Sequence, residues 1–157
     1  MGWTILVWAL PACLALLLVS AGIEDARHRE IANWKNAAIA LLAPLWWVAV
    51  GLDPWPMMAI QLGGALIAFA LFCGAFALGQ MGGGDVKLIG ALALWLAPLN
   101  VMNMLIVMSL AGGALTLAFL LEHKLLRREG AIEIPYGVAI AFAGLLALRE
   151  PLVNQFT

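Results

Sequence analysis

The sequence predicts an all-α, polytopic membrane protein with six transmembrane helices, folded as a single domain over residues 1–157. Three observations predict this fold. Hydrophobic residues make up 65% of the chain and charged residues only 11%. The mean hydropathy of +1.03 is far above that of a soluble domain. A spanning helix needs about 20 mostly apolar residues, and successive apolar runs fill the chain, separated by charges, prolines or glycines.

Each expected helix ends where the sequence stops being apolar or breaks helical geometry. The first run, residues 3–23, lacks a basic n-region and is longer than the apolar core of a secretory signal, so we interpret it as a spanning helix. The second run stops at Asp53-Pro54-Trp55-Pro56, because two prolines within three residues interrupt a helix. The expected helices are residues 3–23, 34–52, 57–78, 86–98, 100–121 and 135–148.

The fourth helix is predicted to be short and to open at a glycine-rich stretch, Gly82-Gly83-Gly84-Asp85. About 13 residues run from Val86 to Pro98, which is near 20 Å at helical rise and too short to cross a bilayer upright. Short or broken helices are tolerated inside a membrane where they are buried in protein or line a water-filled cavity. We therefore expect a recess at Asp85.

Basic residues orient the predicted helices in the membrane. Only Arg149 falls on one side of the six-helix plan. The other side carries the remaining lysines and arginines, namely Arg27, Arg29, Lys35, Lys87, Lys124, Arg127 and Arg128. By the positive-inside rule that side is the cytoplasm, so both termini are expected outside. The net charge of −1 and the lack of a clustered basic face argue against a nucleic-acid partner.

Two aspartates, Asp25 after the first helix and Asp85 before the fourth, fall on this cytoplasmic side although 60 residues separate them. Acids beside hydrocarbon are costly, by about 2.5–3.5 kcal/mol at a helix centre, and therefore usually have a function. Two alternatives stay open. Asp85 can serve simply as a turn residue whose carboxylate favours a helix N-terminus. Asp25 can be a solvated charge, and composition does not distinguish it from its neighbour Glu24.

A pair of carboxyl groups suits one kind of chemistry. Repulsion between two carboxylates in one site favours a state in which one is protonated and the other ionised. The ionised group can take a proton from an attacking water, and the protonated group can donate to the oxyanion that forms on a peptide carbonyl. The titration belongs to the pair, so neither role is assigned to one residue.

Other catalytic and metal chemistries lack the residues they need. Cys13 and Cys73 have no CxxC spacing. His28 and His123 are single histidines in charged segments, so neither a metal site nor a cofactor is expected. Neither serine lies in a nucleophile-elbow pattern. The tryptophans lie mostly near the ends of apolar runs and are interpreted as anchors at the membrane interface. They are Trp3, Trp8, Trp34, Trp46, Trp47, Trp55 and Trp95.

Three motifs resemble those of the type IV prepilin peptidases, a family of GxGD intramembrane aspartic proteases. Gly82-Gly83-Gly84-Asp85, continued by Val86-Lys87-Leu88, resembles the GxGD motif. The stretch Asp25-x-Arg27-x-Arg29-x-Ile31-x-Asn33 resembles the first-aspartate motif, and Pro135-Tyr136-Gly137 resembles the start of the last helix. The six-helix plan agrees, and the resemblance covers essentially the whole chain.

The resemblance implies that Asp25, and not Glu24, is the first catalytic acid and that Asp85 is the second. Its motifs also imply supporting positions at Gly82, Gly84, Lys87, Arg27, Arg29 and Asn33. The implied enzyme lies in a bacterial inner membrane, or in an archaeal one. It removes the basic leader of prepilins or pseudopilins on the cytoplasmic side, cutting after a glycine just before the substrate's apolar N-terminal helix.

Two departures from the family pattern refine this interpretation. Members that also N-methylate their product carry an extra cytoplasmic domain with paired CxxC motifs, for which residues 24–34 leave no room. The chain therefore resembles the small, tight-adherence (Flp) pilus type, and we expect neither zinc nor methyl transfer. In addition, Ala32 stands where the first motif has proline.

Two other classes of function remain as alternatives. In a small transporter or channel, Asp25 and Asp85 would relay protons or bind a cation at a broken helix. The lack of an internal inverted repeat, and the position of both acids at one face, argue against this class. In a non-catalytic subunit of a pilus or secretion machine, the small residues of the third and fifth helices would simply pack helices. In every case membrane lipid is an expected partner of the chain. The sequence leaves open the particular substrate, the oligomeric state and the need for a partner protein.

Overall fold

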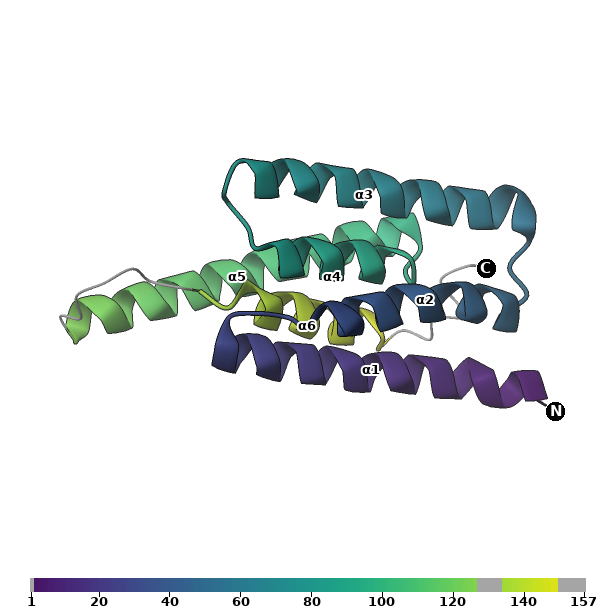
Figure 1. Ribbon diagram of the computed structural model, residues 1–157, viewed down its shortest axis with the longest axis horizontal. Helices are drawn as coiled ribbons and strands as arrows, with labels where there is room; N and C mark the ends of the chain where they lie inside the picture. Colours follow the sequence, from purple (N-terminus) through teal and green to yellow (C-terminus); the bar gives the residue numbers. More distant parts are fainter. Residues whose placement is uncertain (1, 127–133, 150–157) are drawn as a thin grey trace.

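The computed structural model describes residues 2–126 and 134–149 of the chain. These residues form six α-helices and one short π-helical turn, and the described part contains no β-strand (Figure 1). In chain order the elements are α1 (Gly2–His28), α2 (Asn33–Ala49), η1 (Pro54–Met58), α3 (Ala59–Ala77), α4 (Gly83–Ala93), α5 (Pro98–Leu125) and α6 (Tyr136–Ala147). The predicted all-α class is confirmed.

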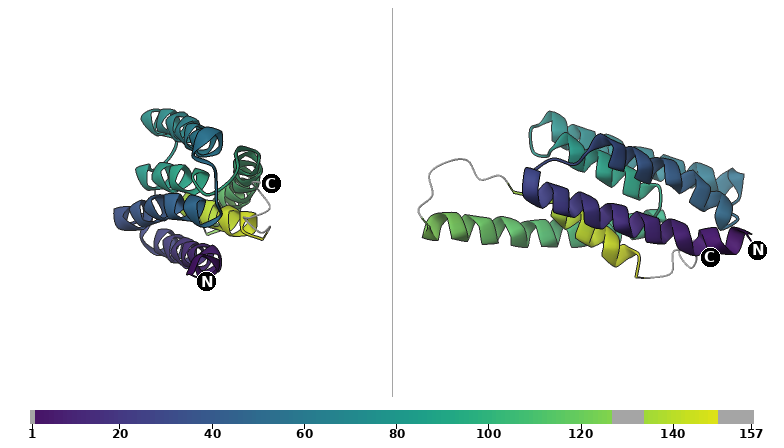
Figure 2. Two further views of the ribbon diagram at one scale, coloured as in Figure 1. Left: turned by 90° about the vertical axis from the view of Figure 1, so that its right-hand side faces the viewer. Right: turned by 60° about the horizontal axis from the view of Figure 1, so that its bottom comes forward.

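The helices form an elongated bundle in which successive helices reverse direction (Figure 1, Figure 2). α1, α3 and α5 run toward one end of the bundle, and α2, α4 and α6 begin at that same end. We call it the site end. α1 packs most extensively against α6. Their approach is close at Gly22, where an added Cβ would lie 3.1 Å from Cβ of Ala141. The fold therefore brings the end of α1 and the starts of α4 and α6 to one place.

Three helical segments within the described residues are long and apolar enough to cross a membrane: Ile5–His28, Pro54–Ala77 and Pro98–Leu125. Large apolar side chains such as Leu16, Ile67 and Leu110 point outward from them and are exposed. Extensive exposed apolar surface marks contact with a membrane or a partner, and the chain is a membrane-embedded protein. α2, α4 and α6 contain only 17, 11 and 12 residues, so six complete spans remain a prediction.

The prediction that the first helix ends at Ile23 is wrong, because α1 continues to His28. The end of an apolar run marks the edge of the hydrocarbon and not the end of a helix, since glutamate and arginine continue a helix well. α1 ends at Arg29, which has a left-handed φ of +58° and donates its backbone N–H to the Asp25 carbonyl at 2.9 Å. Asp25 therefore lies in the last turn of a helix and not in a loop.

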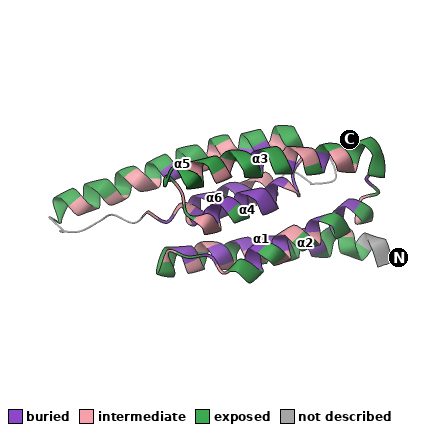
Figure 3. Cartoon of the chain, turned by 45° about the horizontal axis from the view of Figure 1, so that its top comes forward, coloured by how far each residue is buried: buried purple, intermediate pink, exposed green. Residues whose placement is uncertain are grey.

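α4 is the buried centre of the bundle (Figure 3). Its C-terminal carbonyl groups end among apolar side chains, where unpaired polar groups are costly. The buried Gln61 of α3 donates through Nε2 to the carbonyl oxygens of Ala93 (3.0 Å), Leu94 (3.1 Å) and Leu96. Trp47 Nε1 donates to the same Leu94 oxygen at 2.8 Å. These bonds allow a short helix to end inside the protein.

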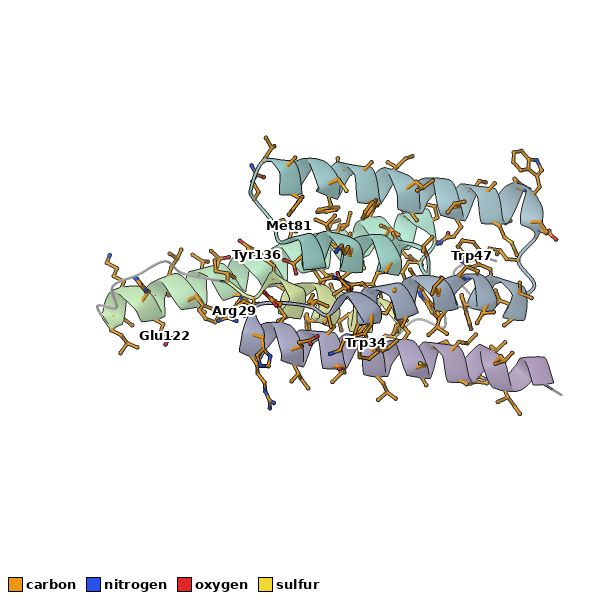
Figure 4. All side chains as sticks on the ribbon, in the orientation of Figure 1. Arg29, Trp34, Trp47, Met81, Glu122 and Tyr136 are labelled. Carbon is orange, nitrogen blue, oxygen red and sulfur yellow. The ribbon has the colours of Figure 1, made fainter. Side chains whose placement is uncertain are left out.

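Three of the tryptophans are core residues, so their interpretation as interfacial anchors is wrong. Trp46 and Trp95 are fully buried and stack with ring centroids 6.1 Å apart. Trp47 is also buried, and its indole faces the α4 terminus as described above (Figure 4). A position near the end of a run does not show which face of the helix a residue occupies. Trp8, Trp34 and Trp55 are exposed, as anchors would be.

Some predictions concern residues outside the described part of the chain. Arg127 and Arg128, which contribute to the predicted orientation, belong to this group, and so does the side chain of Trp3. Lys35, one of the basic residues that give the predicted orientation, lies in the first turn of α2 and is buried.

Candidate active site

Asp25 and Asp85 meet at the site end of the bundle. Asp25 comes from the last turn of α1 and Asp85 from the first turn of α4, and their exposed fractions are only 4% and 8%. Both line one cavity of about 290 Å³, whose other walls are residues 29–31, Asn33 and residues 82–84. We call it the aspartate cavity; it has room for several water molecules, each of which needs about 30 Å³.

The start of α6 holds the carboxyl group of Asp25. The backbone N–H of Val138 donates to Asp25 Oδ2 at 3.2 Å. This N–H also donates to the Pro135 carbonyl at 3.3 Å. It belongs to the first turn of α6, where the helix dipole favours negative charge. Figure 4 labels Tyr136 at this start of α6, beside Arg29 and Met81 at the site end.

Gly137 makes this contact sterically possible. A Cβ at position 137 would lie 2.8 Å from Cγ and Oδ2 of Asp25 and 2.8 Å from Cδ1 of Ile31. Real Cβ atoms essentially never come so close to other heavy atoms. The segment Pro135-Tyr136-Gly137, which the sequence marks only as a helix start, therefore also shapes the surroundings of an acid 112 residues away.

The glycine stretch before Asp85 packs against the connection between α1 and α2. Gly82 is the N-cap of α4 and makes no side-chain capping bond, and Asp85 folds back over it, since a Cβ on Gly82 would lie 3.2 Å from Asp85 Oδ2. Gly84 lies against Ile31, with its virtual Cβ 3.4 Å from the Ile31 Cβ. Asp85 thus lies in the first turn of a helix, where the dipole favours a carboxylate, as the simple turn-residue alternative also predicts. In addition, it faces a second acid.

The structure separates Asp25 from Glu24, which composition alone cannot do. Glu24 Oε2 pairs with Lys35 Nζ at 2.9 Å and accepts the backbone N–H of Ala32 at 3.0 Å. Lys35 also donates to the Ser20 carbonyl at 3.2 Å. Glu24 therefore ties α1 to the start of α2 and is not among the residues that line the aspartate cavity. A proline at position 32, as in the family motif, would have no backbone N–H and could not make this hydrogen bond to Glu24.

The predicted supporting residues occupy different positions. Arg29 and Asn33 line the aspartate cavity, and the Arg29 guanidinium lies 5.3 Å from the Phe119 ring centroid. Lys87 is outside the cavity wall but donates to Asn33 Oδ1 at 2.7 Å. Arg27 is exposed and does not line the cavity, so the structure brings it into no direct relation with the acids.

Sequence reasoning did not select several residues that build the site. Gly137 and Val138 hold Asp25, and the only sequence signal for them is the Pro-Tyr-Gly segment. Asn36 donates to the Gly84 carbonyl at 3.2 Å and so fixes the glycine stretch. Its signal is a polar amide at the start of an apolar run. Together these contacts place two buried carboxyl groups around a space that can hold water, an arrangement suited to general acid and base catalysis.

Comparison with known proteins supports one class of function. Residues 12–117 match the family model for the type IV leader peptidase family. This stretch includes both aspartates and covers more than half of the chain. No curated protein and no solved structure matches. The family match favours a peptidase over a transporter, a channel or a non-catalytic assembly subunit.

Proposed function

Because the chain belongs to the type IV leader peptidase family, and is thus a membrane-embedded peptidase, we propose that it is an aspartic endopeptidase with Asp25 and Asp85 as its catalytic pair. One observation carries the proposal. These two acids come from helices far apart in sequence, and both are buried in the wall of one cavity. Buried acids without a function are disfavoured next to apolar surroundings.

The proposed reaction needs one water and both carboxyl groups. Mutual repulsion favours a pair that carries one proton. The ionised carboxylate takes a proton from water as the water oxygen attacks the scissile carbonyl carbon, and the protonated carboxyl donates to the carbonyl oxygen. Collapse of the tetrahedral intermediate breaks the C–N bond, and the leaving amine receives a proton from the pair. The roles are those of the pair and are not assigned to either residue.

The substrate is proposed to be a prepilin or pseudopilin whose leader ends in glycine before an apolar helix. Its cleavage site would enter the aspartate cavity from the cytoplasm, because Arg29, Lys87 and Lys124 all lie toward the site end of the bundle and positive charge stays on the cytoplasmic side. This orientation puts both termini outside a bacterial inner membrane. Residues 24–34, which include the connection between the first two helices, contain no paired CxxC motifs, which favours the tight-adherence (Flp) type without methyl transfer.

Cleavage of a co-expressed prepilin-type protein tests the proposal. The wild type is expected to shorten the substrate on a gel, while Asp25→Asn and Asp85→Asn are expected to leave it uncut although both variants still insert. Asp53→Asn is a matched control, because Asp53 is an exposed acid at the opposite end of the bundle. Cleavage by either active-site variant would refute the dyad. A wild type that cuts no such substrate would refute the proposed substrate class.

A further inference from the structure

A second hollow lies beside the aspartate cavity. α4 packs against both α2 and α3, while α2 and α3 make at most a weak contact with each other. Between them lies a groove of about 450 Å³, lined by positions 33–40 of α2, 62–69 of α3 and 87–94 at α4. We call it the α2–α3 groove. Asn33 lines both this groove and the aspartate cavity, so the two hollows adjoin at the site end.

The walls of this groove suit an apolar helix. The small side chains of Ala37 and Ala40 line it on α2, and small residues let two helices approach closely inside a membrane. Its head is polar, because the Lys87 ammonium and the Asn33 amide are joined there at 2.7 Å. An ammonium carries three donors, so Lys87 can also donate to peptide carbonyls of an extended segment.

Asn36 supplies a second, independent observation at this groove. Its side chain lines the groove and is only 4% exposed. Its Nδ2 donates to the Gly84 carbonyl, next to Asp85, but no donor among the described residues reaches its Oδ1. A buried acceptor without a partner costs about 1–3 kcal/mol, and such atoms in native proteins call for an explanation. A ligand that brings an N–H group to this point would satisfy it.

We propose that the α2–α3 groove binds the apolar helix of the substrate, and that Asn36 Oδ1 accepts an N–H from the first turn of that helix. The inference rests on the proposed function. The first four N–H groups of any helix have no partner within the helix, and inside a membrane they need one from protein. The bond to be cut directly precedes this helix. The Asn36 contact to Gly84 therefore puts the start of the helix next to Asp85.

The other large groove at the site end fits this role less well. It measures about 520 Å³ and lies between α5 and α6. Its serine and threonine hydroxyl groups are satisfied within their own helix, since Ser109 donates to the Leu105 carbonyl and Thr116 to the Gly112 carbonyl, both at 2.8 Å. It shares no lining residue with the aspartate cavity. It serves as the matched control in the experiments.

Disulfide crosslinking distinguishes the two grooves. In a Cys13→Ala, Cys73→Ala, Asp85→Asn background, Leu66→Cys probes the α2–α3 groove and Leu117→Cys probes the α5–α6 groove. The two leucines are similarly exposed, at 58% and 62%. The probe is a co-expressed prepilin-type protein with one cysteine in the second turn of its apolar helix. We expect the Leu66→Cys crosslink to be at least tenfold stronger. A crosslink mainly from Leu117→Cys, or only between two copies of the chain, would overturn the proposal.

Kinetics with groove-filling variants provide the second test. Ala37→Leu fills the α2–α3 groove with an apolar side chain at an exposed position and is expected to raise KM at least tenfold with kcat nearly unchanged. Gly113→Leu, at a position with nothing within 4 Å of an added Cβ, fills the other groove and is expected to leave KM unchanged. Unchanged KM in both variants would refute the inference, while cleavage by the wild type would still uphold the proposed function. A wild type that does not cut refutes both.

Discussion

Gly137 leaves room for the carboxyl group of Asp25, so its replacement by alanine tests how tightly the site is built. The added Cβ would lie 2.8 Å from Cγ and Oδ2 of Asp25 and from Cδ1 of Ile31. The Ile31 contact involves the end of a flexible side chain and can relax by rotation. The carboxyl group is less free, because the Val138 N–H holds it at 3.2 Å.

The expected effect follows from the size of this clash. To reach ordinary contact at 3.4 Å, the carboxyl group must move by about 0.6 Å, and misplacements near 1 Å cost on the order of 10²-fold in rate. We therefore expect Gly137→Ala to lower kcat for leader cleavage roughly 10- to 100-fold. KM is expected to change little, since the α2–α3 groove does not include position 137. The assay is initial-rate cleavage by the purified enzyme in detergent.

Gly113→Ala is the control for this experiment, because nothing lies within 4 Å of the Cβ added there. It is expected to cut at the wild-type rate. Thermal unfolding of both variants in detergent shows whether Gly137→Ala remains folded at the assay temperature. A folded Gly137→Ala enzyme that cuts within twofold of the wild-type rate would refute the reasoning, since Asp25 would then not depend on this contact.

Two further predictions concern stability. Gln61→Leu removes the donor that serves three carbonyl groups at the end of α4 and is expected to lower the free energy of unfolding by about 1–3 kcal/mol, measured by denaturant titration in detergent. Exposed Gln80→Leu should change it little. Lys35→Met leaves Glu24 without its ion-pair partner and is expected to lower Tm more than Lys124→Met does at an exposed position. Equal Tm values for these two variants would contradict a structural role for the pair.

The sequence predicted the number of helices well and their ends less well. Hydropathy reports where hydrocarbon begins, so the runs of residues 3–23 and 100–121 mark apolar segments inside the longer helices α1 and α5. The helix ends depend instead on local backbone conformation, as at Arg29. This difference matters for function, because it moves Asp25 from a predicted loop onto a helix with a defined side-chain direction.

The sequence did not predict which face of each helix is buried. Trp46, Trp95 and Lys35 are buried, although the tryptophans were expected at the membrane interface and Lys35 on the cytoplasmic side. All-round apolar helices carry no amphipathic signal that identifies the inner face. Which face is buried is decided by the neighbouring helices, and that information is spread over residues distant in sequence.

The sequence by itself determined that this protein is helical, membrane-embedded and equipped with two acids at one end of its helices. Composition, run length and the order of charged segments are sufficient for these conclusions, because they follow from hydration and helical rise alone. Only the tertiary structure assigned Glu24 to an ion pair with Lys35 and Asp25 to a cavity shared with Asp85. It alone also brought Gly137 against Asp25, since this contact depends on the packing of α6 against α1.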